Sequence, residues 1–304
     1  MTFIGARRIE GRFPPEGQFA ELGGGNLHYV DIPATSPGAL TLLMIHGASG
    51  NHSDMVLALE AALAGRYRII SIDRPGHGWS DRIRGREAAS PQRQASLIAD
   101  AMRAIGAPRL IVVSHSMAGA AALQLALNHA DVVAGLALIA PVSHPWPGGI
   151  AWYYEPAARP VIGPLFAHTL TLPLGTFGMQ AGANAVFAPQ KPPPNYIVDA
   201  KIPLVLRPPS FEANAQDVAS LKSFVTAQFA RYASIATPVA IVAGDADATV
   251  SPTIHSHALA AQIVGAELTI LPGVGHAPHH VAPDAVVAAI DSVAARVGRA
   301  LAMR

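Results

Sequence analysis

The chain has 304 residues, of which 51% are hydrophobic and 13% charged, and its formal net charge is +1. This composition is typical of a globular protein with a large core, and it excludes a disordered chain or a strongly basic nucleic-acid-binding protein. The absence of cysteine excludes disulfides and a cysteine nucleophile. The N-terminal region lacks the apolar run of a secretory signal, so we expect a cytoplasmic protein.

The first half of the chain alternates apolar runs with amphipathic segments. Residues 19–22 and 26–32 flank a glycine triplet, and the second of these runs alternates apolar with polar residues, which predicts an antiparallel hairpin at a sheet edge. Continuous apolar runs predict buried strands at residues 40–45, 67–72, 110–113 and 132–139, with helices at 53–64 and 91–105 between them. This alternation predicts an α/β fold, with a mostly parallel sheet covered by helices on both faces.

The pattern breaks at residues 141–235, which are rich in proline. Residues 160–190 contain no Asp, Glu, Lys or Arg, but prolines and glycines interrupt any helix long enough to cross a membrane. We therefore predict a mainly helical cap over a binding cleft, rather than membrane contact. Strands at 239–242 and 267–271, a helix near residues 251–263 and a last helix from about residue 283 resume the α/β pattern. The predicted domains are a core of residues 1–140 and 236–304 and a cap of residues 141–235.

A serine follows the predicted strand at residues 110–113. Ser116 lies between this strand and an alanine-rich segment that predicts a helix. Small residues around it, Ser114, Ala118 and Gly119, leave room for a strained turn that presents the hydroxyl above the sheet. The N-terminus of the following helix also favours an anion formed beside that hydroxyl. We therefore predict that Ser116 is a nucleophile.

A serine nucleophile needs a base within hydrogen-bond distance, and the base needs an acceptor that orients it. Two later strands are each followed by a suitable residue, Asp247 in the first case and His276 in the second. Parallel strands bring both residues to the same edge of the sheet as Ser116, where open α/β sheets bind their ligands.

Five motifs appear in the order and spacing of a known family. With them, the chain resembles the serine-nucleophile, capped branch of the α/β-hydrolase fold superfamily. The motifs are HGASG at 46–50, DRPGHGWSDR at 73–82, SHSMAG at 114–119, GDADATV at 244–250 and GVGHAP at 273–278. Ser114 and Ala118 depart from the family pattern, which most often has glycine at these positions.

The resemblance implies an α/β-hydrolase fold and a role for each matching residue. Ser116 would be the nucleophile, His276 the general base and then the general acid, and Asp247 its acidic partner. The backbone N–H groups of Ala48 and Met117 would form the oxyanion hole.

A serine in this position predicts acyl transfer to water. We expect a serine hydrolase, most simply a carboxylic ester hydrolase, whose substrate is a small to medium, largely apolar ester or related acyl compound, because the predicted cap carries few charges. Two alternatives stay open: a carbon–carbon bond hydrolase of diketone-type substrates with the same triad, and a slow-turnover ligand-binding signalling protein. The expected partner is a small-molecule substrate, without a cofactor, metal, nucleic acid or stable membrane insertion.

Several neighbouring residues compete with these assignments. Asp245 is the alternative to Asp247, but its position favours bonds to local backbone N–H groups. His279 and His280 follow His276, yet no carboxylate or cysteine accompanies them at ligand spacing, so we predict residues of a first helical turn rather than metal ligands.

Other polar residues are predicted to have no catalytic role. Ser49 is expected to support its loop, and the loop at 73–82 is expected to be a structural turn with charge-assisted hydrogen bonds. His255 and His257 are expected to be solvated.

Overall fold

The computed structural model describes residues 2–107 and 109–302, and within them eight strands form one sheet in the order β1-β2-β4-β3-β5-β6-β7-β8. The first two strands form the predicted antiparallel edge hairpin, β2 also pairs antiparallel with β4, and the other pairs are parallel. The strands are β1 Gln18–Leu22, β2 Gly25–Ile32, β3 Thr41–Ile45, β4 Arg68–Ile72, β5 Leu110–His115, β6 Val133–Ile139, β7 Val239–Gly244 and β8 Glu267–Leu271.

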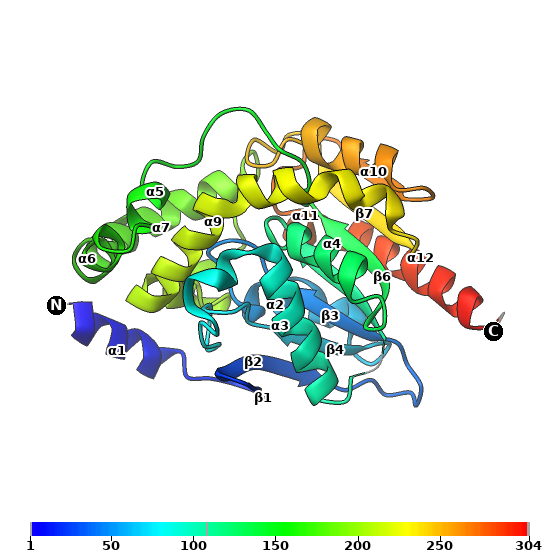
Figure 1. The fold of residues 1–304 in the computed structure, drawn as a ribbon, viewed down its shortest axis with the longest axis horizontal. Helices are drawn as coiled ribbons and strands as arrows, with labels where there is room; N and C mark the ends of the chain where they lie inside the picture. The colour runs from blue at the N-terminus through cyan, green and yellow to red at the C-terminus, as the bar shows by residue number, and fades with distance from the viewer. Residues whose placement is uncertain (1, 108, 303–304) are drawn as a thin grey trace.

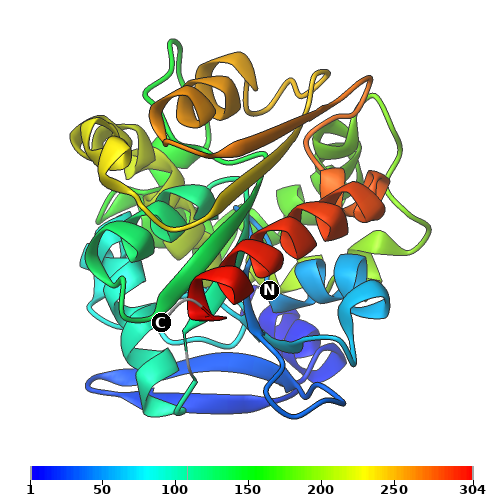
Figure 2. The ribbon, with the colours of Figure 1, turned by 90° about the vertical axis from the view of Figure 1, so that its right-hand side faces the viewer.

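Helices cover both faces of the sheet, as the continuous apolar strands predict. On one face pack α3 (Pro91–Ala104), α4 (Ala118–Asn128) and α10 (Ala258–Gln262), and on the other pack α2 (His52–Leu63) and α12 (Pro283–Ala302). Figure 2 shows α12, drawn in red, crossing its face of the sheet beside α2. Successive strand residues alternate between the two cores: Leu43 and Ile45 belong to the first, and Leu42 and Met44 to the second. Because β3, β5, β6 and β7 run parallel to one another, their carboxyl ends meet at one common edge of the sheet.

The strands β6 and β7 are parallel neighbours in the sheet. A long, mainly helical segment connects them. In Figure 1, α5, α6 and α7 gather at the left of the molecule, and α9 runs from them across α4. The elements are α5 Tyr154–Ala157, α6 Ile162–Thr169, α7 Thr171–Phe187, α8 Tyr196–Asp199, α9 Pro208–Gln228, and the 3-10 helices η2 Ile202–Leu206 and η3 Phe229–Ser234. The division into a core and a cap domain at residues 140/141 and 235/236 stays a prediction, and residues 1, 108, 303 and 304 lie outside the described residues.

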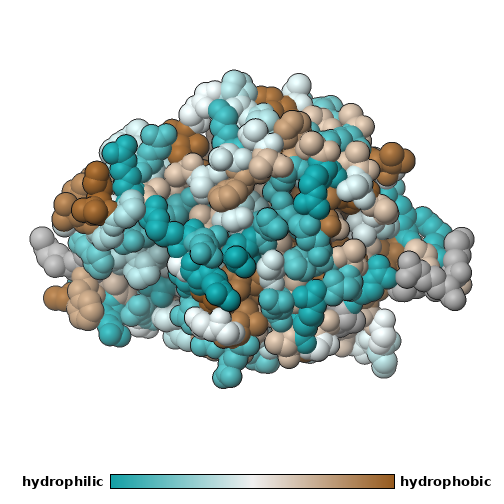
Figure 3. Space-filling model, in the orientation of Figure 1, coloured by the Kyte–Doolittle hydropathy of each residue, from teal (hydrophilic) through white to brown (hydrophobic). Residues whose placement is uncertain are grey.

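The helix α1 (Thr2–Arg12) was not predicted from the sequence, and it packs beside α6 and η2. Figure 3 shows hydrophobic surface at this left end of the molecule. The large exposed apolar side chains of α1 and of residues 152–177 are Phe3, Ile4, Trp152, Val161, Ile162, Leu165, Leu170, Leu174 and Phe177. Among the described residues, no helix is long and apolar enough to cross a membrane.

Three short elements complete the described chain. A 3-10 helix, η1, spans Gly85–Ala89, and α11 spans Pro278–Val281. The helix predicted near residues 251–263 begins with a π-helical turn, η4 (Thr253–His257), and continues as α10.

Candidate active site

The backbone of Ser116 is strained and held in place by hydrogen bonds. Its φ is 55°, in the left-handed region that a serine rarely adopts. Its N–H donates to the carbonyl of Ile139 at 2.9 Å, and its carbonyl accepts from Val142 and Gly119, both at 2.9 Å. The end of β6 and the residues after it therefore fix the turn between β5 and α4, so the hydroxyl has one defined position.

Two glycines allow the close packing around this turn. A Cβ on Gly119 would lie 2.6 Å from Cβ of Pro141, and one on Gly47 would lie 3.2 Å from Cβ of Ser116. Ala118, which replaces the glycine usual in the family, is accommodated in the core on the α4 face. The position of this turn that has no room for a side chain is thus Gly119, one residue after the usual glycine position at Ala118.

The three residues predicted to form a triad meet at the edge of the sheet. His276 Nε2 lies 2.8 Å from Ser116 Oγ, and His276 Nδ1 lies 2.7 Å from Asp247 Oδ2. The other carboxylate oxygen accepts from the N–H groups of Thr249 and Val250, both at 2.8 Å. Because a carboxylate accepts only, the ring proton is on Nδ1 and Nε2 can accept the serine proton. All three side chains are buried.

The competing carboxylate has another partner. Asp245 Oδ1 accepts from the backbone N–H of Gly273 at 2.6 Å, so its partner is a backbone group as predicted, but one in the loop after β8 rather than one nearby in the chain. The geometry therefore favours Asp247 over Asp245 as the partner of His276.

The two predicted oxyanion donors are available. Within the described part of the chain, the backbone N–H groups of Ala48 and Met117 donate to no protein acceptor. Met117 follows Ser116 and is the N-cap residue of α4, and Gly47, which precedes Ala48, packs against Ser116.

His115 is a site residue that the sequence analysis missed. Its Nε2 donates to the carbonyl of His276 at 2.8 Å, and its ring packs 4.8 Å from that of His276. Burial and the neighbouring His279 and His276 keep the pKa of His115 well below its usual value, so the ring is neutral. It ties the residue before Ser116 to the backbone of His276. The available signal was a histidine at the end of a strand that begins as a continuous apolar run.

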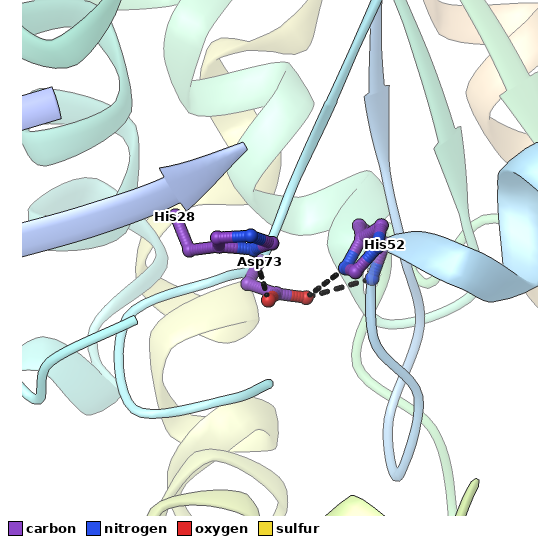
Figure 4. Close-up of side chains that lie close together, drawn as sticks. All are labelled: His28, His52 and Asp73. Atoms are coloured by element: carbon purple, nitrogen blue, oxygen red, sulfur yellow. Dashed lines mark hydrogen bonds and ion pairs between the residues drawn. The ribbon is translucent and has the colours of Figure 1, made fainter. Parts of the chain in front are cut away.

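The predicted structural loop after β4 contains a carboxylate, Asp73, that accepts four hydrogen bonds, and Figure 4 shows those from His28 and His52. Asp73 accepts from the rings of His28 and His52 at 2.8 and 3.1 Å, and from the N–H groups of His52 and Trp79 at 2.7 and 2.8 Å. The second ring nitrogen of His28 faces the carbonyl of Glu16. The ligand atoms of His28, His52 and Asp73 are close enough together for a metal ion, but each of these side chains is already hydrogen-bonded. The cluster is thus a structural tie between β2, the loop and α2.

One expectation about the histidines after His276 was wrong. A carboxylate does accompany them: Asp54, from α2, accepts from His279 Nε2 at 3.3 Å, from His280 Nε2 at 2.9 Å and from the hydroxyl of Tyr196 at 2.9 Å. Sequence spacing could not reveal it because α2 and α11 are distant in the chain. The placement of both histidines in a first helical turn is confirmed.

This second cluster also places ligand atoms of Asp54, His115 and His279 within 4.8 Å of one another. His115 Nε2 is bonded to the His276 carbonyl, and Asp54 is bonded to both histidines of α11. An ion would have to replace these bonds, so the contacts support a tie between α2 and α11.

A second expectation was also wrong, because His255 is buried whereas His257 is exposed as predicted. His255 Nδ1 accepts from the N–H groups of Ser143 and His144, both at 3.2 Å. Burial lowers the pKa of His255 to about 4, so the ring is a neutral acceptor. It fixes the backbone that follows β6.

The sheet, the elbow serine and the histidine facing it define the class of α/β hydrolases. The chain belongs to the alpha/beta hydrolase family, because residues 42–289 match the model of that family.

Individual relatives are more distant. The chain is 36% identical over 126 residues to the dihydrolipoyllysine-residue acetyltransferase component of the acetoin cleaving system of Cupriavidus necator, an alignment that covers 41% of this chain and only 32% of the relative. It is 28% identical over 253 residues to an uncharacterised protein of Mycobacterium tuberculosis, covering 79% of this chain and 70% of the relative. Among solved structures, it is similar in fold to the enol-lactonase of Burkholderia xenovorans, with a TM-score of 0.70, 20% identity, and coverage of 91% and 100% of the two chains.

Proposed function

We propose that this protein is a serine hydrolase that forms an acyl-enzyme on Ser116. The observation that carries the proposal is the continuous hydrogen-bond path from Ser116 Oγ through His276 to Asp247. Such a path activates a hydroxyl that is otherwise a poor nucleophile at neutral pH. The strained elbow supports the same chemistry, and so do the N–H groups of Ala48 and Met117, which have no acceptor among the residues that the structure describes.

The proposed reaction has two half-reactions with one proton carrier. His276 Nε2 takes the proton of Ser116 as Oγ attacks the acyl carbonyl, and the N–H groups of Ala48 and Met117 stabilise the oxyanion. Collapse of the resulting tetrahedral intermediate breaks the bond to the leaving group, which receives the proton from His276. Water then attacks the acyl-enzyme in the same way, giving the acid and free Ser116.

The substrate we propose is a small to medium, largely apolar carboxylic ester. Apolar side chains pack around the elbow: Met117, Ala120, Val142, Leu221, Val225 and Val250, with Trp146 against them. Residues of this kind favour an uncharged acyl group over a charged one, because a buried charge needs a partner. The similarity in fold to an enol-lactonase is compatible with an ester-type bond.

The proposal is tested by labelling with a fluorophosphonate, read out by intact mass and peptide mapping. We expect one adduct on Ser116 in the native protein, and none in Ser116→Ala or His276→Ala. p-Nitrophenyl esters of increasing chain length then define the acyl group. A folded native protein that neither labels on Ser116 nor hydrolyses any ester would contradict the proposal.

A further inference from the structure

The peptide bond between Gly47 and Ala48 is held from its carbonyl side. The Gly47 carbonyl accepts from His46 Nδ1 at 2.9 Å and from Arg74 Nη2 at 3.2 Å. His46 Nε2 accepts from the backbone N–H of Arg74 at 3.0 Å, so the ring proton is on Nδ1. The C=O and N–H of a trans peptide point in opposite directions, so these bonds also fix the direction of the Ala48 N–H.

Arg74 is a fully buried cation whose five N–H donors are all used. Nε donates to the carbonyl of His46 at 3.1 Å, and Nη2 donates to Gly47 and to His77 Nε2, the latter at 3.1 Å. Nη1 donates to Gln94 at 3.1 Å and to Asp217 at 2.7 Å. Because both carbonyls of the His46-Gly47 pair depend on one planar guanidinium, its position sets theirs.

The helix α9 approaches the same loop from the segment between β6 and β7. Asp217 is the counter-ion of Arg74, and it also accepts from Arg82 at 2.7 Å. One turn earlier, Asn214 accepts from the N–H of Ser49 at 2.8 Å and donates to its hydroxyl at 3.0 Å. Ser49 has a φ of 57°, so these bonds hold a strained residue directly after Ala48.

We infer that Arg74 is a positioning residue for the Ala48 oxyanion donor, and that Asn214 and Asp217 make this donor depend on α9 being seated. The inference rests on the proposed function. With α9 in place, the loop is held on both sides of Ala48, and a carbonyl bonded to a cation polarises its own peptide N–H. If α9 moves away, Ser49 loses two bonds and Arg74 loses its counter-ion. The oxyanion hole is therefore complete only when α9 is seated over the nucleophile.

The test compares Arg74→Met and Asn214→Ala with a matched control, Arg82→Met. Arg82 bonds to the same carboxylate as Arg74 but, among the described residues, makes no hydrogen bond to the loop at 46–50. We expect kcat for a p-nitrophenyl ester to fall about 10²-fold in Arg74→Met and about tenfold in Asn214→Ala, with KM within about threefold, as for loss of an oxyanion donor. The control should keep kcat within about threefold. Melting curves report whether each variant is folded, and Asn214→Ala, which removes no charge, serves if Arg74→Met does not fold.

A second readout separates positioning of the donor from general damage. A trifluoromethyl ketone forms a tetrahedral oxyanion on an active serine, so its inhibition constant should rise by the factor by which kcat/KM falls. An unreactive alcohol of the same chain length should inhibit all variants equally. Wild-type kcat in folded Arg74→Met and Asn214→Ala, with turnover still dependent on Ser116, would overturn this inference and leave the hydrolase proposal standing. Absence of labelling and turnover in the native protein would instead overturn the proposed function.

Discussion

At the scale of single residues, the strain at Ser116 is maintained by contacts with the chain after β6. Gly119 packs directly on Pro141, and the next residue, Val142, donates to the Ser116 carbonyl. Any side chain at position 119 must push these residues apart, which would release the turn that presents the hydroxyl.

We therefore predict that Gly119→Ala impairs both stability and activity. Overpacking should lower the free energy of unfolding by about 1–3 kcal/mol, and the displaced elbow should slow fluorophosphonate labelling by about tenfold or more. Gly178→Ala is the matched control, because a Cβ there meets nothing within 4 Å. Chemical denaturation and labelling rates give the result, and equal behaviour of the two variants would refute the packing argument.

A second prediction concerns the hydrogen bond from His115 to the His276 carbonyl. His115→Phe keeps a ring but removes the donor, so His276 should be less well aligned with Ser116. We expect kcat to fall about tenfold with little change in KM, the loss typical of a misaligned catalytic group. His115→Gln retains an N–H donor at a similar reach and should recover most of the activity. If the two variants lose activity equally, the hydrogen bond does not position His276.

The residues of the site differ in how far the sequence could predict them. Ser116, Asp247 and His276 each follow a clear strand within a motif, so strand order alone brings them together. Asn214 and Asp217 lie in a helix without a motif, and polar residues in such a helix ordinarily face solvent. Their burial depends on where α9 lies in three dimensions, which periodicity does not contain.

At the scale of elements, the N-cap residues of α2 and α3 differ in the hydrogen bonds that they make. Asn51 caps α2 by accepting from Ser53 at 3.0 Å, and its amide donates to the carbonyls of Ala200 and Lys201 at 2.9 and 3.2 Å. Ser90 caps α3 through one longer bond of 3.4 Å. The first cap therefore also joins a core helix to the segment between β6 and β7.

We predict that Asn51→Ala costs about 2–3 kcal/mol of unfolding free energy, because it removes the cap and leaves the buried carbonyl of Ala200 without its partner. Ser90→Ala should cost only about 0.5–1 kcal/mol. Urea unfolding of both variants measures the difference, and equal costs would show that the bonds to residues 200 and 201 contribute little.

The elements of the core could be predicted because the central strands β3, β5, β6 and β7 are largely apolar runs and α3 has a clear serine–proline start. The helix α1 could not, since glycines at 5 and 11 lower its intrinsic propensity. Leu172 fills the space beside Gly5, so packing against the later segment accounts for this helix better than its own sequence does.

At the scale of the whole molecule, several histidines are buried and neutral. Burial is the largest cause that lowers the pKa of His46 to about 3 and those of His255 and His279 to about 4, and it holds the pKa values of His77 and His115 well below the usual one. In the unfolded chain these groups titrate near pH 6.5. Between about pH 6.5 and 4, the unfolded state therefore binds more protons than the folded state.

We predict that stability is greatest above about pH 6.5 and declines as the pH falls toward 4. Each histidine that protonates only on unfolding contributes a slope of about 1.4 kcal/mol per pH unit. Urea unfolding at pH 7.5, 6.0 and 5.0 measures the decline, and His255→Asn should reduce its slope. A free energy of unfolding that is constant over this range would contradict the prediction.

The adjacency of β6 and β7 has a consequence for how the protein can be re-engineered. The chain leaves the sheet at one strand and returns at its immediate parallel neighbour, with Ile139 paired to Val242. The intervening segment is therefore attached to the sheet at a single place, and a graft from another family member could replace it without altering the strand register. A graft that lacks an asparagine and an aspartate three residues apart, facing Ser49 and Arg74, should fold and bind its ligand yet turn it over slowly. Transplanted specificity would then require that pair to be transplanted as well.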